Sequence, residues 1–232
     1  MVRTVSSEVR ESDNPGARRR EWLRRARLYL VCDAQPHGRD PEELLRPALQ
    51  AGVDVVQLRE KGGDERDIVR AGRVFRRLTD AYDALFIVND RPELALACGA
   101  DGVHVGQDDA SPAEVRRMVG SDALIGLSTH SPEQVDAVAA ADYFCVGPVH
   151  ATPTKPEYEP VGLDLVRYAA ARAEVPFFAI GGIDPGNVEE VVQAGAERVV
   201  VVRAIRDVAD PGAATRALRE RIDAALHAGA RG

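Results

Sequence analysis

Long apolar runs are missing from this 232-residue chain. A membrane-spanning helix needs about 18 consecutive apolar residues, so we expect no membrane partner, and the first residues also lack the apolar core of a secretory signal. Cysteine is scarce as well, with only Cys32, Cys98 and Cys145, and no CxxC spacing. An odd number of cysteines without that spacing disfavours disulfides and a zinc site, and it predicts reduced, mostly buried thiols in a cytoplasmic protein.

An excess of positive charge is also absent. Lysine and arginine total 30 against 37 aspartate and glutamate residues, which gives a net charge of −7. This balance disfavours a protein that binds nucleic acid mainly through charge, so we expect no nucleic-acid partner.

The oligomeric state is not decided by the sequence, and a homo-oligomer stays open.

Residues 1–26 are polar and show no strand or turn pattern. They lead into a basic cluster over residues 18–27, which could belong to a nucleic-acid or membrane patch. A flexible tail that runs into a short solvated helix explains the same composition more simply. We therefore predict a polar, flexible N-terminal extension over residues 1–26 and a folded domain over residues 27–232.

Within the folded part, short apolar runs alternate with helix-like segments. The apolar runs predict eight strands, at residues 28–31, 53–58, 85–88, 102–105, 123–127, 143–146, 176–180 and 199–202. Several helix starts are marked by a capping residue followed by proline, as at Asp40-Pro41, Ser111-Pro112, Ser131-Pro132 and Asp184-Pro185. Eight strand–helix units predict an α/β protein with a parallel sheet, and they favour a single closed (β/α)8 TIM barrel. The absence of GxGxxG after the first strand disfavours a dinucleotide-binding sheet.

In such a barrel the chemistry lies where strands end and loops begin. After the second strand, Gln57, Arg59 and Lys61 would point the same way in an extended chain, and two glycines follow. Two cations and an amide donor suit a multiply charged phosphate group. A charged loop without a ligand is the alternative.

Acidic residues follow the third and fourth strands. Asp90 comes after Asn89 at the end of one strand, and Asp109 lies in the loop after the next. Magnesium is commonly held by one or two carboxylates together with substrate phosphates and water. The pair therefore predicts a site for one Mg²⁺ ion, with helix capping as the alternative role for either acid.

The remaining strand ends carry groups that suit anions. Ser128 follows the fifth strand and is a candidate hydroxyl donor to an oxyanion. A nucleophile–base pair of Ser128 with His130 is less convincing, because the two residues are only two positions apart in sequence. The loop after the sixth strand is long and contains Thr152, Thr154 and Lys155. Gly181-Gly182 and the eighth strand end complete a typical barrel phosphate site. We thus predict two anion pockets, one for a diphosphate and one for a monophosphate.

Six motifs at these strand ends together resemble the thiamine phosphate synthase family. They are QLREK at 57–61, VND at 88–90, HVGQDD at 104–109, GLS at 126–128, TPTKP at 152–156 and AIGGI at 179–183. The resemblance covers about residues 27–225. It implies a magnesium-dependent transferase that joins a hydroxymethylpyrimidine diphosphate to a hydroxyethylthiazole phosphate and releases pyrophosphate.

The resemblance also implies a role for each residue. The pyrimidine diphosphate would be held by Gln57, Arg59, Lys61, Asn89, Ser128 and Lys155. Of these, Arg59, Lys61, Ser128 and Lys155 would be catalytic, because they would stabilise the departing diphosphate, while Asp90 and Asp109 would hold the magnesium ion. The thiazole phosphate would be held by Thr152, Pro153, Thr154, Gly182, Val202 and Arg203.

The chain departs from the family pattern at Arg203, where many members have serine, and at His150, where many have an aromatic residue. Arg203 could bind the thiazole phosphate or point outward. Two other interpretations stay open, a thiazole phosphate tautomerase-like barrel and a non-catalytic protein that binds thiazole phosphate.

Overall fold

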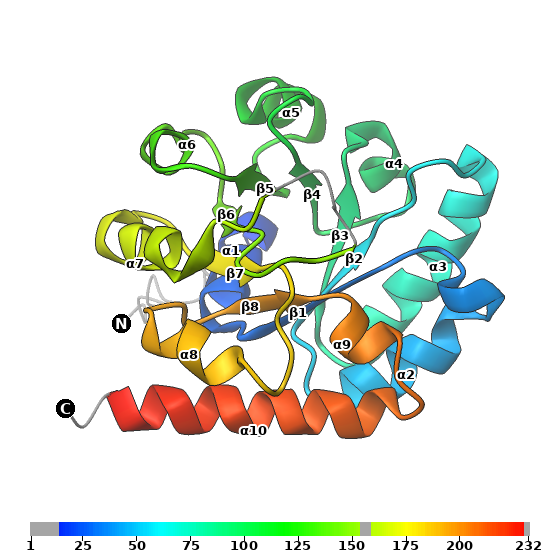
Figure 1. Cartoon of the computed structure of the whole chain (residues 1–232). Helices are drawn as coiled ribbons and strands as arrows, with labels where there is room; N and C mark the ends of the chain where they lie inside the picture. The colour runs from blue at the N-terminus through cyan, green and yellow to red at the C-terminus, as the bar shows by residue number, and fades with distance from the viewer. Residues whose placement is uncertain (1–13, 154–158, 230–232) are drawn as a thin grey trace, which may run out of the picture.

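The computed structural model describes residues 14–153 and 159–229. Eight parallel strands follow one another in sequence order and close into a barrel, and helices surround it (Figure 1). The strands are β1 Leu28–Cys32, β2 Val55–Leu58, β3 Leu85–Asn89, β4 Gly102–Val105, β5 Leu124–Thr129, β6 Tyr143–Val146, β7 Phe177–Ile180 and β8 Val199–Val201. The predicted single (β/α)8 barrel is therefore confirmed.

The helices begin close to where the capping residues predict. They are α1 Pro15–Arg25, α2 Pro41–Gln50, α3 Glu65–Ala81, α4 Pro92–Ala97, α5 Pro112–Val119, α6 Pro132–Asp136, α7 Gly162–Arg172, α8 Val188–Gln193, α9 Arg203–Arg206 and α10 Pro211–Gly229, with a short 3-10 turn η2 at Pro36–Gly38. Asp40 and Ser111 accept hydrogen bonds from backbone N–H groups in the first turns of α2 and α5. No helix in the described ranges has the length and apolar character that a bilayer crossing needs.

One predicted helix start is wrong. The pattern places a helix start at Asp184-Pro185, but α8 begins at Val188. The Asp184 carboxylate accepts a hydrogen bond from the Gly186 N–H at 2.6 Å, and Asn187 Oδ1 accepts one from the Asp184 N–H at 2.9 Å. These two bonds form a tight turn of the kind that aspartate and asparagine favour, so the cap-like sequence ends in a turn before the helix.

The apolar core has two layers because strand side chains alternate in direction. One layer lies between the strands and the surrounding helices. The other fills the barrel interior and contains large buried side chains, among them Tyr29, Leu85, Tyr143 and Phe178. The interior is therefore a packed core, and the cavity lies above it, at the carboxyl ends of the strands.

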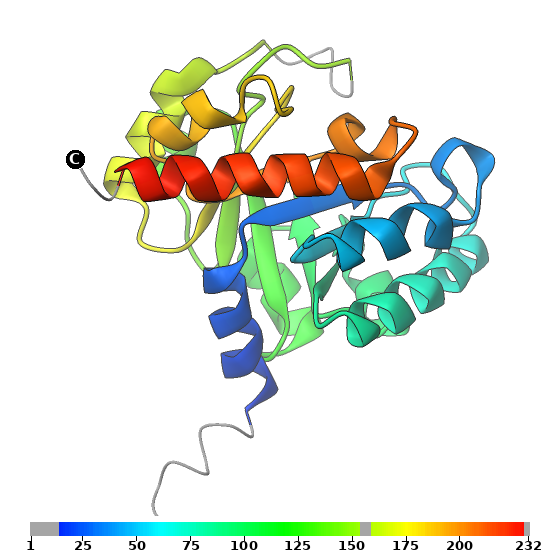
Figure 2. The same ribbon diagram turned by 90° about the horizontal axis from the view of Figure 1, so that it is seen from below.

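Helix α1 closes the amino-terminal end of the barrel, at the lower end of the view in Figure 2. Leu23 is 1% exposed and packs on the interior layer. Arg19 pairs with Asp101 at 2.9 Å and Arg20 pairs with Asp142 at 2.6 Å, and both acids lie just before strands. Residues 15–25 thus form a short helix, as predicted after the tail, but this helix is packed on the barrel and is not a flexible, solvated segment. Residues 1–13 lie outside the described residues.

This packing generates a stability prediction. Leu23→Ala should lower the free energy of unfolding by about 2–5 kcal/mol, because it leaves a cavity under the barrel. Urea unfolding followed by circular dichroism measures the change. Arg25→Ala is the control, since its side chain is 77% exposed and its ion pair with Glu21 lies at the surface, where such pairs contribute at most about 1 kcal/mol. An unchanged urea midpoint for Leu23→Ala would show that α1 is not docked.

Candidate active site

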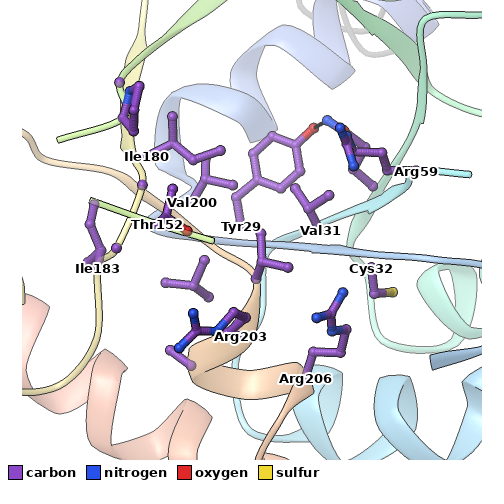
Figure 3. A pocket seen from close by; sticks show the side chains of 18 of the residues that line it. Tyr29, Val31, Cys32, Arg59, Thr152, Ile180, Ile183, Val200, Arg203 and Arg206 are labelled. Carbon is purple, nitrogen blue, oxygen red and sulfur yellow. Dashed lines mark hydrogen bonds between the residues drawn. The ribbon is translucent and has the colours of Figure 1, made fainter. Parts of the chain in front are cut away.

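A cavity of about 880 Å³ opens at the carboxyl ends of the strands. Its lining includes most residues that the sequence predicts for the site: Gln57, Arg59, Lys61, Asn89, Ser128, Thr152, Gly182, Val202 and Arg203. Figure 3 shows Arg59 near the hydroxyl end of Tyr29 and Arg203 apart from it, on another part of the cavity wall. Positive charge therefore enters the cavity from two strand ends that lie far apart in sequence.

The residues after β2 are held by β1. The Arg59 N–H donates a hydrogen bond to the Cys32 carbonyl at 2.8 Å, which extends the β1–β2 pairing by one residue. Gln57 lies within the strand and is 4% exposed, and its amide nitrogen donates to the Tyr29 hydroxyl at 2.6 Å. Gln57 therefore lies deeper than Arg59 and Lys61, which follow the strand at the rim.

Asp90 and Asp109 form a close carboxyl pair at the rim. Burial and the neighbouring Asp109 carboxyl raise the pKa of Asp90, while Lys61 and Arg59 act in the opposite direction. The Asp109 carboxylate also accepts a hydrogen bond from the Gly106 N–H at 2.7 Å. Asp90 adopts a left-handed backbone conformation with φ of 60°, which aspartate tolerates better than most residues.

Neither acid caps a helix. The residue at the N-cap of α4 is Arg91, which makes no side-chain capping bond, and the N-cap of α5 is Ser111, which forms a capping box with Glu114. The capping alternative for these acids is therefore wrong. The pair is instead a place where two like charges meet beside two cations, and a bound divalent cation would relieve the repulsion between them.

Two protein carboxylates suit a magnesium ion whose other ligands are water and substrate phosphate oxygens. In the part of the chain that the structure describes, no group of three or more His, Cys, Asp and Glu side chains could hold a metal. Magnesium keeps several waters and often takes its other ligands from substrate phosphates, so two carboxylates are a sufficient protein contribution. The donor set fits that ion, and a ligand with phosphate oxygens would have to complete the shell.

Ser128 makes a contact that the sequence did not reveal. Its hydroxyl lies 3.0 Å from His104 Nε2, and its carbonyl accepts a hydrogen bond from the Gln107 amide at 2.6 Å. His130 instead directs Nδ1 at the Gly147 carbonyl. Ser128 and His130 therefore do not form a nucleophile–base pair with each other, and the role of Ser128 as a hydroxyl donor stays a prediction.

The glycine pair after β7 brings bare backbone to the cavity. Gly182 has a φ of 64°, and a Cβ there would lie 2.7 Å from the His150 Cβ and 2.9 Å from the Ala151 carbonyl oxygen. The loop after β6 thus packs directly on Gly182 and brings Thr152 to the cavity lining. Pro153 follows Thr152 but does not contribute to that lining, and Thr154 and Lys155 lie outside the described residues.

The eighth strand end supplies cations. Val202 and Arg203 both line the cavity, and the Arg203 side chain is 49% exposed, with Nε 3.6 Å from an Asp207 carboxylate oxygen. Arg206, which no sequence motif pointed to, also lines the cavity, and its guanidinium lies 3.4 Å from the Asp33 carboxylate. Its position one helical turn after Arg203 is the signal that could have identified it.

His150 is directed at Glu190, with Nε2 3.5 Å from a carboxylate oxygen, and it is not part of the cavity lining.

Known proteins resemble this chain over most of its length. Residues 28–205 match the family model described as thiamine monophosphate synthase. A thiamine-phosphate synthase of Acidothermus cellulolyticus is 50% identical over 204 residues, which cover 86% of this chain and 96% of that protein. One of Arthrobacter sp. is 46% identical over 225 residues, with 86% and 95% covered. The solved structure of a thiamine phosphate pyrophosphorylase from Pyrococcus furiosus is 32% identical, with a TM-score of 0.80 and 89% and 98% covered.

The raised pKa of Asp90 generates a prediction about stability. A carboxyl whose native pKa lies above its unfolded value binds more protons in the native state, so the free energy of unfolding falls as pH rises through that native pKa. Asp90→Asn removes this penalty, and asparagine also accepts the left-handed backbone. At pH 7 with EDTA, we expect Asp90→Asn to unfold at a higher urea concentration than the unmodified chain.

The matched control is Asp108→Asn, which changes an adjacent exposed acid without touching the pair. Its urea midpoint should match that of the unmodified chain. If Asp90→Asn unfolded at lower urea than this control, the Asp90 carboxylate would be stabilising and the repulsion argument would be wrong.

Proposed function

This chain belongs to the thiamine monophosphate synthase family, and we propose that it joins a hydroxymethylpyrimidine diphosphate to a hydroxyethylthiazole phosphate. The bond between the pyrimidine methylene carbon and the diphosphate oxygen breaks, and a bond from that carbon to the thiazole nitrogen forms. The products are thiamine phosphate and pyrophosphate. The 50% identity to a thiamine-phosphate synthase over nearly all of its length supports this reaction.

The observation that carries the proposal is the meeting of two cations and two acids on one rim. Lys61 and Arg59 lie close enough to Asp90 to lower its pKa, and Asp109 lies close enough to raise it. A diphosphate would match Arg59 and Lys61, and Asp90 and Asp109 would hold a divalent cation that supplies further positive charge to the same ligand. A site for a neutral ligand would gain nothing from this arrangement.

The role of the protein in bond breaking is electrostatic. Negative charge develops on the leaving diphosphate oxygens, where Arg59 and Lys61 stabilise it and the Ser128 hydroxyl donates a hydrogen bond. Asn89 and Gln57 orient the pyrimidine end, and Lys155 remains a predicted further cation. A pyrimidine carbon with carbocation character then meets the thiazole nitrogen, so no protein nucleophile is needed.

We propose that Asp90 and Asp109 hold one magnesium ion. A bound magnesium ion would neutralise charge on the diphosphate oxygens as the diphosphate leaves. The close carboxyl pair and the raised pKa of Asp90 support this assignment. Held by the two acids, the ion would add its charge to that of Lys61 and Arg59, which lie close to Asp90.

The thiazole phosphate is assigned to the other side of the cavity. Backbone around Gly182, the Thr152 hydroxyl and the start of α9 at Val202 and Arg203 line that side, and Pro153 and Thr154 stay predictions. An arginine guanidinium binds a phosphate through two parallel hydrogen bonds, which the serine of many relatives cannot do. We therefore assign the phosphate contact to Arg203.

Cys32, Cys98 and Cys145 are all free and buried, which favours a reducing compartment and supports a cytoplasmic location.

A thiazole phosphate tautomerase would need no diphosphate pocket, so the rim of cations and acids argues against that alternative.

Magnesium dependence is the first expected outcome. Purified protein with both substrates and Mg²⁺ should form thiamine phosphate, and EDTA should stop the reaction. Asp109→Asn should need a higher Mg²⁺ concentration for half-maximal rate, because one ligand loses its charge, whereas the control Asp108→Asn should not. Absence of product from folded protein would refute the proposed reaction, and an unchanged Mg²⁺ requirement in Asp109→Asn would refute only the metal assignment.

Arg203 provides a second expected outcome. Arg203→Ala should raise KM for the thiazole phosphate roughly tenfold or more, since a charge-assisted hydrogen bond contributes about 1.5–3 kcal/mol. KM for the pyrimidine diphosphate should stay the same. Arg167→Ala, on the exposed surface of α7, is the control and should change neither value. Equal KM values in Arg203→Ala and the control would mean that backbone amides hold the phosphate alone.

A further inference from the structure

A chain of polar side chains crosses the barrel interior, and all but one of its members line the cavity. The Gln57 amide lies 2.6 Å from the Tyr29 hydroxyl, which lies 3.1 Å from the Tyr143 hydroxyl. Tyr143 lies 3.3 Å from His104 Nδ1, and His104 Nε2 lies 3.0 Å from the Ser128 hydroxyl. These five residues come from five different strands, so only the closed barrel brings them together. We call this set the interior polar chain.

The burial of the interior polar chain requires that its members be hydrogen-bonded. Tyr29 and Tyr143 are completely buried, and His104 is 7% exposed. Burial raises the pKa of each tyrosine far above its usual range, so both remain neutral phenols with one hydrogen to donate. An unpaired polar group at this depth costs about 1–3 kcal/mol, so the bonds are expected to form in one consistent direction.

The direction follows from the Gln57 end. The Gln57 amide nitrogen can only donate, so the Tyr29 oxygen accepts. Within residues 14–153 and 159–229, the other hydrogen-bond partner of the Tyr29 hydroxyl is Tyr143, so Tyr29 donates to Tyr143. Tyr143 in turn donates to His104 Nδ1. A neutral imidazole that accepts at Nδ1 carries its hydrogen on Nε2, which then donates to the Ser128 oxygen.

β5 leaves room for this arrangement at Gly126. His104, Gly126 and Tyr143 are in register on three neighbouring strands. A Cβ at Gly126 would lie 2.3 Å from His104 Nδ1 and 2.2 Å from Tyr143 Cζ. Any larger residue would therefore push apart the two side chains that pass the hydrogen bond to Ser128.

We propose that His104, set by Tyr143, is a positioning residue that holds the Ser128 hydroxyl as a donor toward the cavity. With its oxygen occupied by His104 Nε2–H, Ser128 directs its own hydrogen away from His104 and toward the ligand. The Gln107 bond to the Ser128 carbonyl restrains the backbone from the other side. The inference rests on the proposed function, because the hydrogen gains its value where negative charge develops on the leaving diphosphate.

A double-mutant cycle tests this role. His104→Phe keeps a ring and removes both nitrogens, and we expect it to lower kcat about tenfold, the size of one lost hydrogen bond. In a Ser128→Ala background the same substitution should lower kcat less than about twofold, because the group it positions is gone. His104→Gln, whose amide can donate to Ser128, should recover part of the rate. Equal losses in both backgrounds would overturn the proposal and assign His104 a packing role.

A measurement that does not depend on activity separates the positioning role of His104 from the proposed reaction. Nitrogen NMR of the unmodified protein should show His104 with its hydrogen on Nε2, and Tyr143→Phe, which removes one oxygen, should populate the Nδ1–H form. A hydrogen on Nδ1 in the unmodified protein would overturn the inferred direction. If the unmodified protein formed no thiamine phosphate while showing the Nε2–H form, the reaction would be wrong and the hydrogen-bond direction would stand. Circular dichroism of each variant separates loss of fold from loss of positioning.

Discussion

The pairing of β8 with β1 is the constraint on which the site depends. Leu28, Tyr29 and Leu30 are in register with Val199, Val200 and Val201, and this pairing closes the sheet. Because all eight strands are parallel, closure puts all their carboxyl ends on one rim. The cations after β2, Ser128 on β5 and the glycines after β7 then face a single cavity, and the acids after β3 and β4 lie beside those cations without lining it. An open sheet of the same strands would leave the first and last of these groups at opposite edges.

Charge at this rim is balanced between neighbours. Arg59 and Lys61 would repel one another without nearby acids, and Asp90 and Asp109 would repel one another without nearby cations. Arg59 and Asp90 are half-buried, which strengthens these effects because less water screens them. The balance is incomplete, since the pKa of Asp90 remains raised. The proposed diphosphate and divalent cation would together supply the charges that complete this balance.

The two ends of the barrel have different tasks. At the amino-terminal end, α1 covers the apolar interior, and its arginines pair with Asp101 and Asp142 beside the strand starts. Asp142 also accepts hydrogen bonds from Arg116 and from the Ile125 N–H. These contacts stabilise the barrel far from the cavity. The opposite end is therefore free to keep like charges together and polar groups half exposed, which stability alone would disfavour.

The sequence by itself determined the features that depend on near neighbours in the chain. Three local features were enough to predict the barrel and the strand ends that line its cavity. They are the apolar runs, the capping residues at Asp40 and Ser111, and the two-residue spacing that points Arg59 and Lys61 to the same side of an extended chain. Asp184-Pro185 shows the limit, because the same capping pattern also suits a tight turn. The roles of the individual site residues stay predictions.

Only the tertiary structure decided which distant groups meet. Arg20 lies 122 residues from Asp142, and Tyr29 lies 114 residues from Tyr143, so no local pattern links either pair. The interior polar chain crosses from Tyr29 on β1 to Tyr143 on β6 and needs the closed barrel, and the register of β4, β5 and β6 aligns His104 with Gly126 and Tyr143. The docking of α1 and the raised pKa of Asp90 depend on burial and on contacts between distant segments, which the sequence alone does not give.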